Sequence, residues 1–577
     1  MTLPRMLAVS ALVLLAWACG QGGADADAGA DTDTGTEAEP DADADADADA
    51  DGDTDTGPDP CSNSDMIPTF DPADCPEQEP VEECVRFVDV DSQAEEPDGL
   101  SWDTAFREVQ PGIDSARCGA IVNGSCEVWV AEGRYHVYTF SRRETIELRP
   151  GVSVYGGFAG DETALEQRDF VAHEVILDGQ DANDGPCHAL HVVTGSDDAV
   201  LDGVTVTGGR ARLFSGIENA EDGGGMLNVD ASPTVGNCAF VANEALRRGG
   251  GMHSLRGSPV IHDCLFRENA VAGSSGGGGL FLKDSAEGQV PAHIERCTFI
   301  GNTASGSSGG ALHSSADSVV IEDSAFHQNE AQGAGAIYAK CSASAGCELT
   351  VERCTFAENK SKQDSSAVRV QGWGDILIRG CLFHDNAGGG FTALASAPVV
   401  ENCVFVGNVG QTIGAIRNWG GRAHLLNCTV HGNSAALPDG AGGVYSENGE
   451  ASCGSDCPVV TNCIVRGNAP VDVKDTAGAV TTVSFSDIGG GWPGMGNIDA
   501  DPLFVNASGQ DFHLLGGSPC IDAADGLAAP ELDFDGNERC DDPGSPNAGL
   551  GPPWADMGAF ENASHLDLRS PGRAGMR

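Results

Sequence analysis

The chain contains 87 aspartates and glutamates, so its first candidate chemistry is acid–base catalysis. On a sugar, such chemistry requires two carboxylates held roughly 5–10 Å apart. Asp197 and Asp198 are adjacent in the sequence, but a chain this rich in acids contains such pairs by chance. We find no positive catalytic motif, and we favour a non-enzymatic role.

A second set of residues could bind a ligand without transforming it. Each follows an aliphatic residue that comes directly after a glycine-rich corner, so its side chain should point outward where the aliphatic points inward. The set consists of His253, Phe281, His313, Tyr338, Arg369, Arg417 and Tyr445, and Ala395 interrupts it. Stacked rings and guanidinium groups can bind a glycan or another extended polymer. The alternative is that these side chains only cover a flat sheet face.

A short acidic loop near the C-terminus could bind calcium. Asp533, Asp535 and Asn537 alternate around a glycine, and oxygen ligands in this order resemble a calcium loop. The glutamate that completes an EF-hand loop is missing from its position. The alternative is an Asp-Gly-Asn turn held by a disulfide between Cys520 and Cys540. Ca²⁺ is the one cofactor that the sequence suggests.

A repeat in the middle of the chain must position these residues. Its core is a cysteine, a phenylalanine two residues later and an asparagine five residues later. The nine copies begin at Cys238, Cys264, Cys297, Ser324, Cys354, Cys381, Cys403, Cys428 and Cys463, and the last two have valine in place of phenylalanine. An aliphatic residue lies three positions before each start: Val235, Ile261, Ile294, Ile321, Val351, Ile378, Val400, Leu425 and Val460.

The spacing of the repeat predicts short strands separated by corners. Cysteine and phenylalanine are two residues apart, so they share one face of a strand. The aliphatic residue lies three residues before the cysteine, which is an odd number, so both side chains point inward only if the chain turns between them. The nine copies span 225 residues in eight steps, near 28 residues per step. We expect about three short strands per coil, stacked in parallel as an all-β solenoid. Cysteines, phenylalanines and asparagines should then form ladders, the asparagines bonding the backbone and one another.

The repeat resembles the right-handed parallel β-helix, or pectin-lyase-like, superfamily. Its Phe-x-x-Asn and Gly-Gly-Ala-Leu (309–312) elements look like the repeats of bacterial polymorphic outer-membrane proteins. The resemblance implies a right-handed β-helix over residues 85–490. It also implies, as an alternative function, a polysaccharide lyase or glycoside hydrolase. The polygalacturonase and pectate lyase motifs are missing apart from the pair at Asp197.

The two ends of the chain differ from the repeat. Residues 491–561 resemble a choice-of-anchor Q region, which we expect to cap the last coil, and residues 562–577 form a tail. Residues 1–18 predict a signal peptide that ends before Cys19. This junction resembles the lipobox of bacterial lipoproteins, which implies acylation of Cys19 and a membrane anchor. Cleavage by an ordinary signal peptidase, giving an extracellular protein, is the alternative.

An acidic tether follows the predicted anchor. Residues 24–60 carry 15 acids and no lysine or arginine, so residues 19–60 should be extended and solvated. Residues 61–84 form a cysteine-containing segment that leads into the β-helix. No other apolar run is long enough to predict a membrane-spanning helix.

The 21 cysteines divide into three groups. One is the predicted lipid site, eight belong to the interior ladder, and twelve remain for disulfides. We expect the pairs Cys118–Cys126, Cys341–Cys347, Cys453–Cys457 and Cys520–Cys540, with Cys61, Cys75, Cys84 and Cys187 forming two more. This number of disulfides favours an oxidising compartment.

The formal net charge of −56 argues against nucleic-acid binding, because contact with phosphates requires a basic surface. The sequence therefore predicts an outer-membrane or cell-surface lipoprotein that adheres to or binds a glycan. A structural surface filament is a further alternative.

Overall fold

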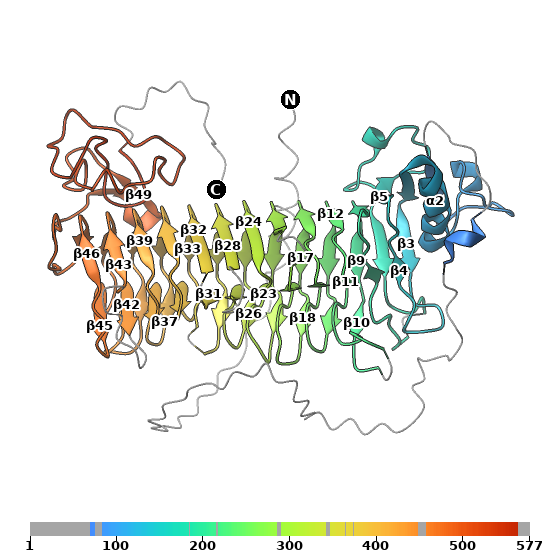
Figure 1. Cartoon of the computed structure of the whole chain (residues 1–577), viewed down its shortest axis with the longest axis horizontal. Helices are drawn as coiled ribbons and strands as arrows, with labels where there is room; N and C mark the ends of the chain where they lie inside the picture. Colours follow the sequence, from blue (N-terminus) through green and yellow to red (C-terminus); the bar gives the residue numbers. More distant parts are fainter. Residues whose placement is uncertain are drawn as a thin grey trace. The chain divides into compact units, whose positions relative to one another are not determined.

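The computed structural model describes residues 70–75, 84–183, 185–214, 217–285, 290–341, 347–363, 365–372, 374–447 and 457–562. The predicted signal peptide, Cys19, the acidic tether and almost all of the tail lie outside these residues. The described residues between 84 and 498 form a parallel β-helix in which three long sheets run along the coils (Figure 1). This confirms the predicted fold class.

Each coil passes through sheet 1, then sheet 2, and then sheet 3. Sheet 1 contains β1 (Val85–Val88), β2 (Cys126–Ala131), β5 (Val152–Phe158), β8 (Val200–Asp202), β12 (Thr234–Gly236), β16 (Val260–His262), β20 (Ala292–Glu295), β24 (Ser318–Glu322), β28 (Cys347–Glu352), β32 (Gly374–Arg379), β35 (Val399–Glu401), β39 (His424–Leu426), β43 (Val459–Thr461) and β46 (Thr482–Ser484). Sheet 2 contains β3 (Gly133–His136), β6 (Val175–Asp178), β9 (Thr205–Thr207), β13 (Ala239–Val241), β17 (Leu265–Arg267), β21 (Thr298–Ile300), β25 (Ala325–His327), β29 (Thr355–Ala357), β33 (Leu382–His384), β36 (Val404–Val406), β40 (Thr429–His431), β44 (Ile464–Arg466) and β47 (Asp487–Ile488).

Sheet 3 contains β4 (Ile146–Glu147), β7 (Val193–Thr194), β11 (Met226–Val229), β15 (Met252–Leu255), β19 (Leu280–Lys283), β23 (Leu312–Ser315), β27 (Ile337–Lys340), β31 (Val368–Gln371), β34 (Phe391–Leu394), β38 (Ile416–Trp419), β42 (Val444–Glu447) and β45 (Val473–Thr476). Two-residue strands add a short fourth side between sheets 2 and 3: β10 (Arg210–Ala211), β14 (Glu244–Ala245), β18 (Ala270–Val271), β22 (Thr303–Ala304), β26 (Glu330–Ala331), β30 (Lys360–Ser361), β37 (Val409–Gly410) and β41 (Ser434–Ala435).

The predicted corner between the aliphatic residue and the cysteine is a single residue in the left-handed conformation. This residue directly precedes the cysteine, and its φ lies between 48° and 59° in the nine repeats. It reverses the parity of the strand, so that Val235 and Cys238, for example, both enter the core. The sequence at this corner is Asn237, Asp263, Arg296, Asp323, Arg353, Gly380, Asn402, Asn427 and Asn462.

All three predicted ladders form inside the coils. Neighbouring phenylalanine rings from Phe240 to Phe405 stack with centroids 4.5–4.9 Å apart. The eight ladder cysteines are free and buried. From Asn243 to Asn468, each asparagine donates its Nδ2 hydrogen to the Oδ1 atom of the next, at 2.8–3.1 Å. The repeated residues therefore form one continuous core.

A helix closes the first coil. The helix α2 (Val109–Asn123) contributes Ile113, Ala116 and Ala120 to the same core as the strands. The disulfides Cys75–Cys118 and Cys84–Cys126 connect this end of the molecule. The predicted pair Cys118–Cys126 is therefore wrong, because each of these two cysteines faces a partner far away in the sequence. The prediction that Cys75 and Cys84 pair within the set that also contains Cys61 and Cys187 is wrong for the same reason.

The other disulfide predictions have different outcomes. Cys341–Cys347 forms as expected. Cys520 and Cys540 are both free, so that predicted bond is wrong. Cys187 and Cys457 are disulfide-bonded, whereas Cys61 and Cys453 lie outside the described residues.

The remaining short helices are the 3₁₀ turns η1 (Pro72–Asp74), η2 (Trp102–Thr104), η3 (Leu165–Gln167) and η4 (Ala507–Gly509).

The C-terminal region does more than cover the end of the solenoid. Trp492 packs against the core, and the amide of Ile498 donates to the carbonyl of Ser486 at the last coil. Residues 499–562, which we name the flank segment, pack instead against the side of the last coils (Figure 1). The flank segment includes the antiparallel strands β48 (Phe504–Asn506) and β49 (Asp511–Leu514). Its Phe512 and Phe560 bury the outward side chains of Val404 and Val406.

Candidate functional site

The predicted outward residues form one register column on sheet 3. Direct pairing runs from His253 to Phe281, His313, Tyr338, Arg369, Thr392, Arg417, Tyr445 and Lys474. The predicted gap at Ala395 is wrong, because Thr392 occupies that position. In this coil Phe391 follows the glycine corner and enters the core, and Ala395 lies past β34 with a φ of 45°.

The first part of the column is buried. His253 is 0% exposed and Phe281 is 4% exposed, although both side chains leave the sheet on the side away from the core. The Arg248 guanidinium lies 5.7 Å from the Phe281 ring centroid, and the Asp222 carboxylate lies 3.8 Å from His253 Nδ1. Burial lowers the pKa of His253 to about 4, outweighing the opposite effect of Asp222. These two residues offer no surface for a ligand.

The second part of the column is partly open, although Thr392 and the predicted residue Tyr445 are buried. The Arg369 guanidinium lies 5.6 Å from the Tyr338 ring centroid, and Tyr338 donates to Gln371 Oε1 at 2.5 Å. Arg417 lies 4.2 Å from the Trp419 ring centroid and donates through Nε to Glu447 Oε1 at 2.8 Å. These contacts place each guanidinium over a ring, within the distance of a cation–π interaction.

Residues that the sequence analysis missed complete this surface. Trp419, which is 36% exposed, and Lys340 lie two positions after column residues, so strand alternation brings them to the same face. Lys474 extends the column by one coil. Period-two counting past Arg417 and Tyr338 would have found Trp419 and Lys340, whereas Lys474 required the register of one more coil. We name the outward positions of β27, β31, β34, β38, β42 and β45 the cationic face; they are Tyr338, Lys340, Arg369, Gln371, Thr392, Leu394, Arg417, Trp419, Tyr445, Glu447, Lys474 and Thr476.

The charge of the cationic face is opposite to that of the chain. Its twelve positions carry four cations and one acid, Glu447. The whole chain has 31 lysines and arginines against 87 acids. A local excess of cations on such an acidic protein attracts anionic ligands to this face.

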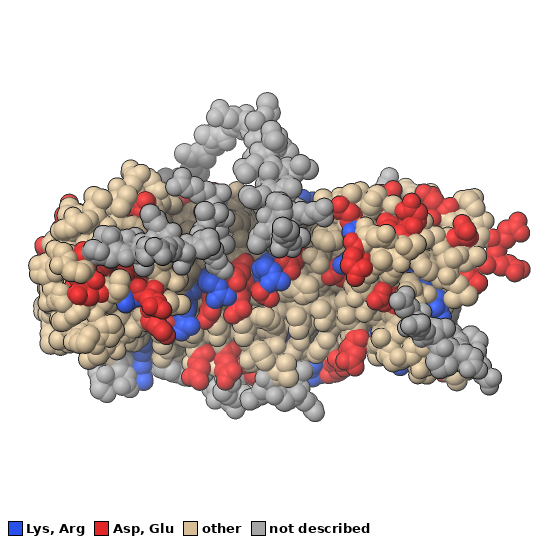
Figure 2. Space-filling view, turned by 90° about the horizontal axis from the view of Figure 1, so that it is seen from above, with Lys and Arg blue, Asp and Glu red and all other residues tan. Residues whose placement is uncertain are grey.

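Acidic residues converge on a different surface, the corner between sheets 1 and 2. The face seen in Figure 2 has basic side chains lying next to acidic ones. Asp263 pairs with Arg296 at 2.8 Å, and Asp323 pairs with Arg353 at 3.0 Å. Arg353 also contacts Glu352 at 2.7 Å. Since these carboxylates are paired with arginines, the corner is built for electrostatic cohesion between coils.

The predicted calcium loop is arranged as a turn. Asp533 accepts hydrogen bonds from the amides of Asn537 at 2.7 Å and Glu561 at 2.9 Å. Asp535 instead contacts His513 Nε2 at 2.7 Å, and this contact raises the pKa of His513 to about 9. The described residues contain no group of three His, Cys, Asp or Glu side chains that could hold a metal ion. Asp533 and Asp535 are thus both engaged in contacts within the flank segment.

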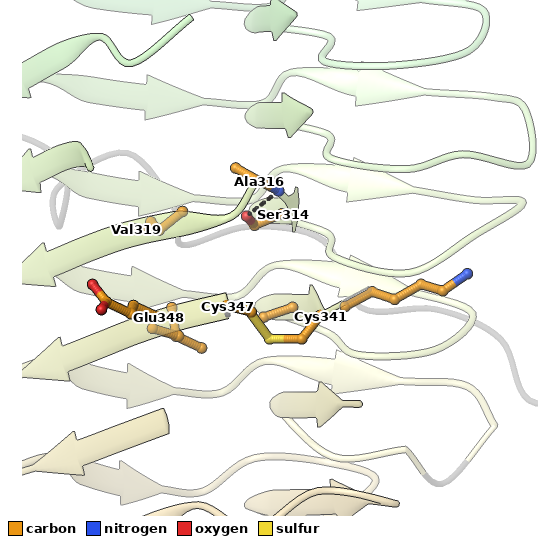
Figure 3. A pocket seen from close by; sticks show the side chains of 9 residues that line it. Ser314, Ala316, Val319, Cys341, Cys347 and Glu348 are labelled. Atoms are coloured by element: carbon orange, nitrogen blue, oxygen red, sulfur yellow. Dashed lines mark hydrogen bonds between the residues drawn. A yellow bond between two sulfur atoms is a disulfide. The ribbon is translucent and has the colours of Figure 1, made fainter. Parts of the chain in front are cut away.

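A cavity beside the Cys341–Cys347 disulfide is too small for an organic ligand. Its volume of about 10 Å³ is room for one water at most. Figure 3 shows the disulfide next to Ser314 and Ala316, where the Ala316 amide donates to Ser314 Oγ at 3.2 Å. A larger, open hollow of about 230 Å³ lies between Pro530, Pro553 and the neighbouring flank-segment residues. The partly exposed cationic face is thus a better candidate than either cavity.

Comparison with known proteins supports the fold. Residues 278–464 match the family model described as a right-handed β-helix region. Comparison with curated proteins gave no match. In the described part of the chain, no helix has the length and apolar character needed to cross a bilayer.

Similar solved structures include the A-module of a mannuronan C-5 epimerase from Azotobacter vinelandii, at 15% identity and a TM-score of 0.32, covering 71% of this chain and 96% of that one. A pectate lyase has 14% identity and a TM-score of 0.29, covering 83% and 96%. A surface adhesin of Streptococcus pneumoniae has 10% identity and a TM-score of 0.22, covering 59% and 89%. These likenesses concern the fold alone.

Proposed function

We propose that this chain is an exported lipoprotein that binds an acidic polysaccharide along the cationic face without transforming it. The observation that carries this proposal is the reversal of charge on that face, together with guanidinium groups stacked on Tyr338 and Trp419. Arginine offers paired donors to carboxylate or sulfate groups, and aromatic rings stack on sugar faces.

The geometry of the column suits a linear polymer. Successive coils of a parallel β-helix lie about 4.8 Å apart, so the column runs parallel to the axis of the solenoid. A chain laid along it contacts Tyr338, Arg369, Arg417 and Lys474 in turn. Many weak contacts of this kind sum to a stable complex when the polymer spans several of them.

Binding to polygalacturonate tests the proposal. The triple variant Tyr338→Ala/Arg369→Ala/Arg417→Ala should bind at least about tenfold more weakly in isothermal titration calorimetry, because it loses two guanidinium contacts and one stacking surface, each a contribution of about 1 kcal/mol. Wild-type binding should also weaken as salt is added, since the contacts are electrostatic.

The matched control is Arg296→Ala/Arg353→Ala, which removes two arginines from the corner between sheets 1 and 2. It should bind polygalacturonate as the wild type does. Equal affinity of the triple variant and the wild type, at an unchanged melting temperature, would remove the cationic face from consideration. Release of reducing or unsaturated sugars during the titration would show that the protein cleaves the polysaccharide and does not only bind it.

The export part of the proposal rests on the disulfides and the N-terminal sequence. Three described disulfides indicate an oxidising compartment, hence an exported protein. We propose cleavage after residue 18 and acylation of Cys19, with residues 19–60 holding the β-helix away from the membrane. Mass spectrometry of the mature N-terminus should detect acylated Cys19, and Cys19→Ala should move the protein to the soluble fraction. An unmodified mature N-terminus would favour ordinary secretion.

A further inference from the structure

The flank segment buries more negative charge than positive charge. Asp522 is 0% exposed, and Asp556 and Glu561 are each 1% exposed. Arg539 lies among them and donates through Nη1 to Glu561 Oε2 at 3.0 Å. Within the described part of the chain, neither Asp522 nor Asp556 has an ion-pair partner. Buried carboxylates without a cation favour their neutral form.

These carboxyl groups hold the flank segment together through backbone amides. Asp556 accepts hydrogen bonds from the amides of Asp522 at 2.8 Å and Asn562 at 2.7 Å. Glu561 accepts from the amide of Cys540 at 3.1 Å. The carboxyl groups of Asp556 and Glu561 therefore connect parts of the flank segment that are distant in sequence.

The cluster is continuous with the interface to the coils. Arg539 Nη2 donates to Asn402 Oδ1 at 2.8 Å, and Asn427 Nδ2 donates to the carbonyl of Asp556 at 3.0 Å. The amide of Gly558 donates to the carbonyl of Asn462 at 2.7 Å. The residues that surround the buried carboxyl groups therefore also make the contacts that dock the segment on the left-handed corners.

Other charged groups around the cluster are mostly acidic. Burial raises the pKa of Glu561 to about 7 and of Asp522 to about 6. Burial, followed by the charge of Glu561, raises the pKa of Asp556 as well. The remaining titratable groups that face the cluster or its neighbours are Cys520, Cys540, Asp533, Asp541, Asp542 and the Arg466–Asp487 pair.

We propose that the flank segment is an acid-stabilised latch, which docks on the last coils while these carboxyl groups are protonated and is released as they ionise. Release uncovers Leu382, Val404 and Val406 on the outer face of sheet 2. The latch is independent of the cationic face, which lies on sheet 3.

The direction of the pH effect follows from linkage. The pKa of Asp522 is about 6 when docked and 3.8 as its ordinary value, so the docked state binds the proton more tightly. Docking is strongest below about pH 3.8 and weakens as the pH rises, until it levels off above about pH 6. The change amounts to roughly a hundredfold in the docking equilibrium for Asp522 alone.

Hydrogen exchange measured by mass spectrometry on the full chain tests the latch. After correction for intrinsic exchange rates, amides of residues 520–562 should be protected at pH 5 and exchange markedly faster at pH 8. Core peptides around Phe326 and Phe356 should show no such change. Equal corrected protection of the segment at both pH values would overturn the proposal.

Two variants separate the latch from general acid effects. Asp522→Asn carries a permanently neutral group of nearly the same shape at a buried carboxyl that has no ion-pair partner among the described residues, so it should remain protected at pH 8. Glu538→Gln removes an exposed acid from the same segment and should behave as the wild type. An Asp522→Asn variant with the full pH dependence would contradict the latch. Restored protection at pH 8 on adding calcium would assign the cluster to a metal and not to protons.

Discussion

At the scale of single residues, the asparagine ladder shows why one residue type recurs. The amide of Asn329 donates through Nδ2 to the carbonyl of Phe299 at 3.0 Å and to Asn359 Oδ1 at 3.0 Å. Its Oδ1 accepts from both the backbone and the side chain of Asn302. Each asparagine thus satisfies buried polar groups in three coils, and no other side chain of this size both donates and accepts in the same plane.

We expect Asn329→Ala to lower the free energy of unfolding by about 4 kcal/mol, because it leaves several buried polar groups without partners. Equilibrium denaturation in guanidinium chloride measures this loss. Gln328→Ala, an exposed change in the same turn, should stay within about 0.5 kcal/mol of the wild type. A loss below about 1 kcal/mol for Asn329→Ala would show that water replaces the amide.

At the scale of elements, both ends of the solenoid are protected. The backbone of Phe106 forms hydrogen bonds with the outer edge of β1, and α2 covers the core at this end. At the other end, the backbone of Ile498 forms hydrogen bonds with the last coil. Unpaired strand edges promote association with other chains, so these contacts disfavour end-to-end stacking into a filament. The flank segment adds a second kind of contact, because its backbone carbonyls accept hydrogen bonds from the corner residues Asn402, Asn427 and Asn462.

At the scale of the whole molecule, acid should act on the coils and on the flank segment in opposite directions. His253 is buried in its neutral form, with a pKa of about 4 against its ordinary value of 6.5. A group whose pKa is depressed by folding stabilises above its unfolded pKa and loses that contribution as the pH falls. Up to about 3 kcal/mol is therefore lost between pH 6.5 and pH 4.

His253→Leu should remove this acid sensitivity, because Leu227 already fills the neighbouring position of the same column with 6% exposure. The free energy of unfolding of the variant should exceed that of the wild type at pH 4 by up to about 3 kcal/mol, with a smaller difference at pH 7. Chemical denaturation at a series of pH values measures both. Parallel pH curves for the two proteins would show that His253 does not titrate on unfolding.

Most of the coil could be predicted because its information is local and repeated. The odd spacing of Val235 and Cys238 required a corner, and Asn237 in the left-handed conformation provides it. The outward column of sheet 3 was also predictable, since alternation along a strand follows from backbone geometry. Its exposure was not, because Arg248 and Asp222 reach His253 and Phe281 from another part of the coil.

The sequence by itself determined the stacking of the coils, the three interior ladders and the identity of the residues that face outward. Only the tertiary structure decided which outward residues stay accessible, which cysteines meet, and where the flank segment docks. The physical reason is the distance over which the information acts. A ladder repeats one contact between adjacent coils, whereas Asn402 meets the carbonyl of Leu532 across 130 residues that carry no common period.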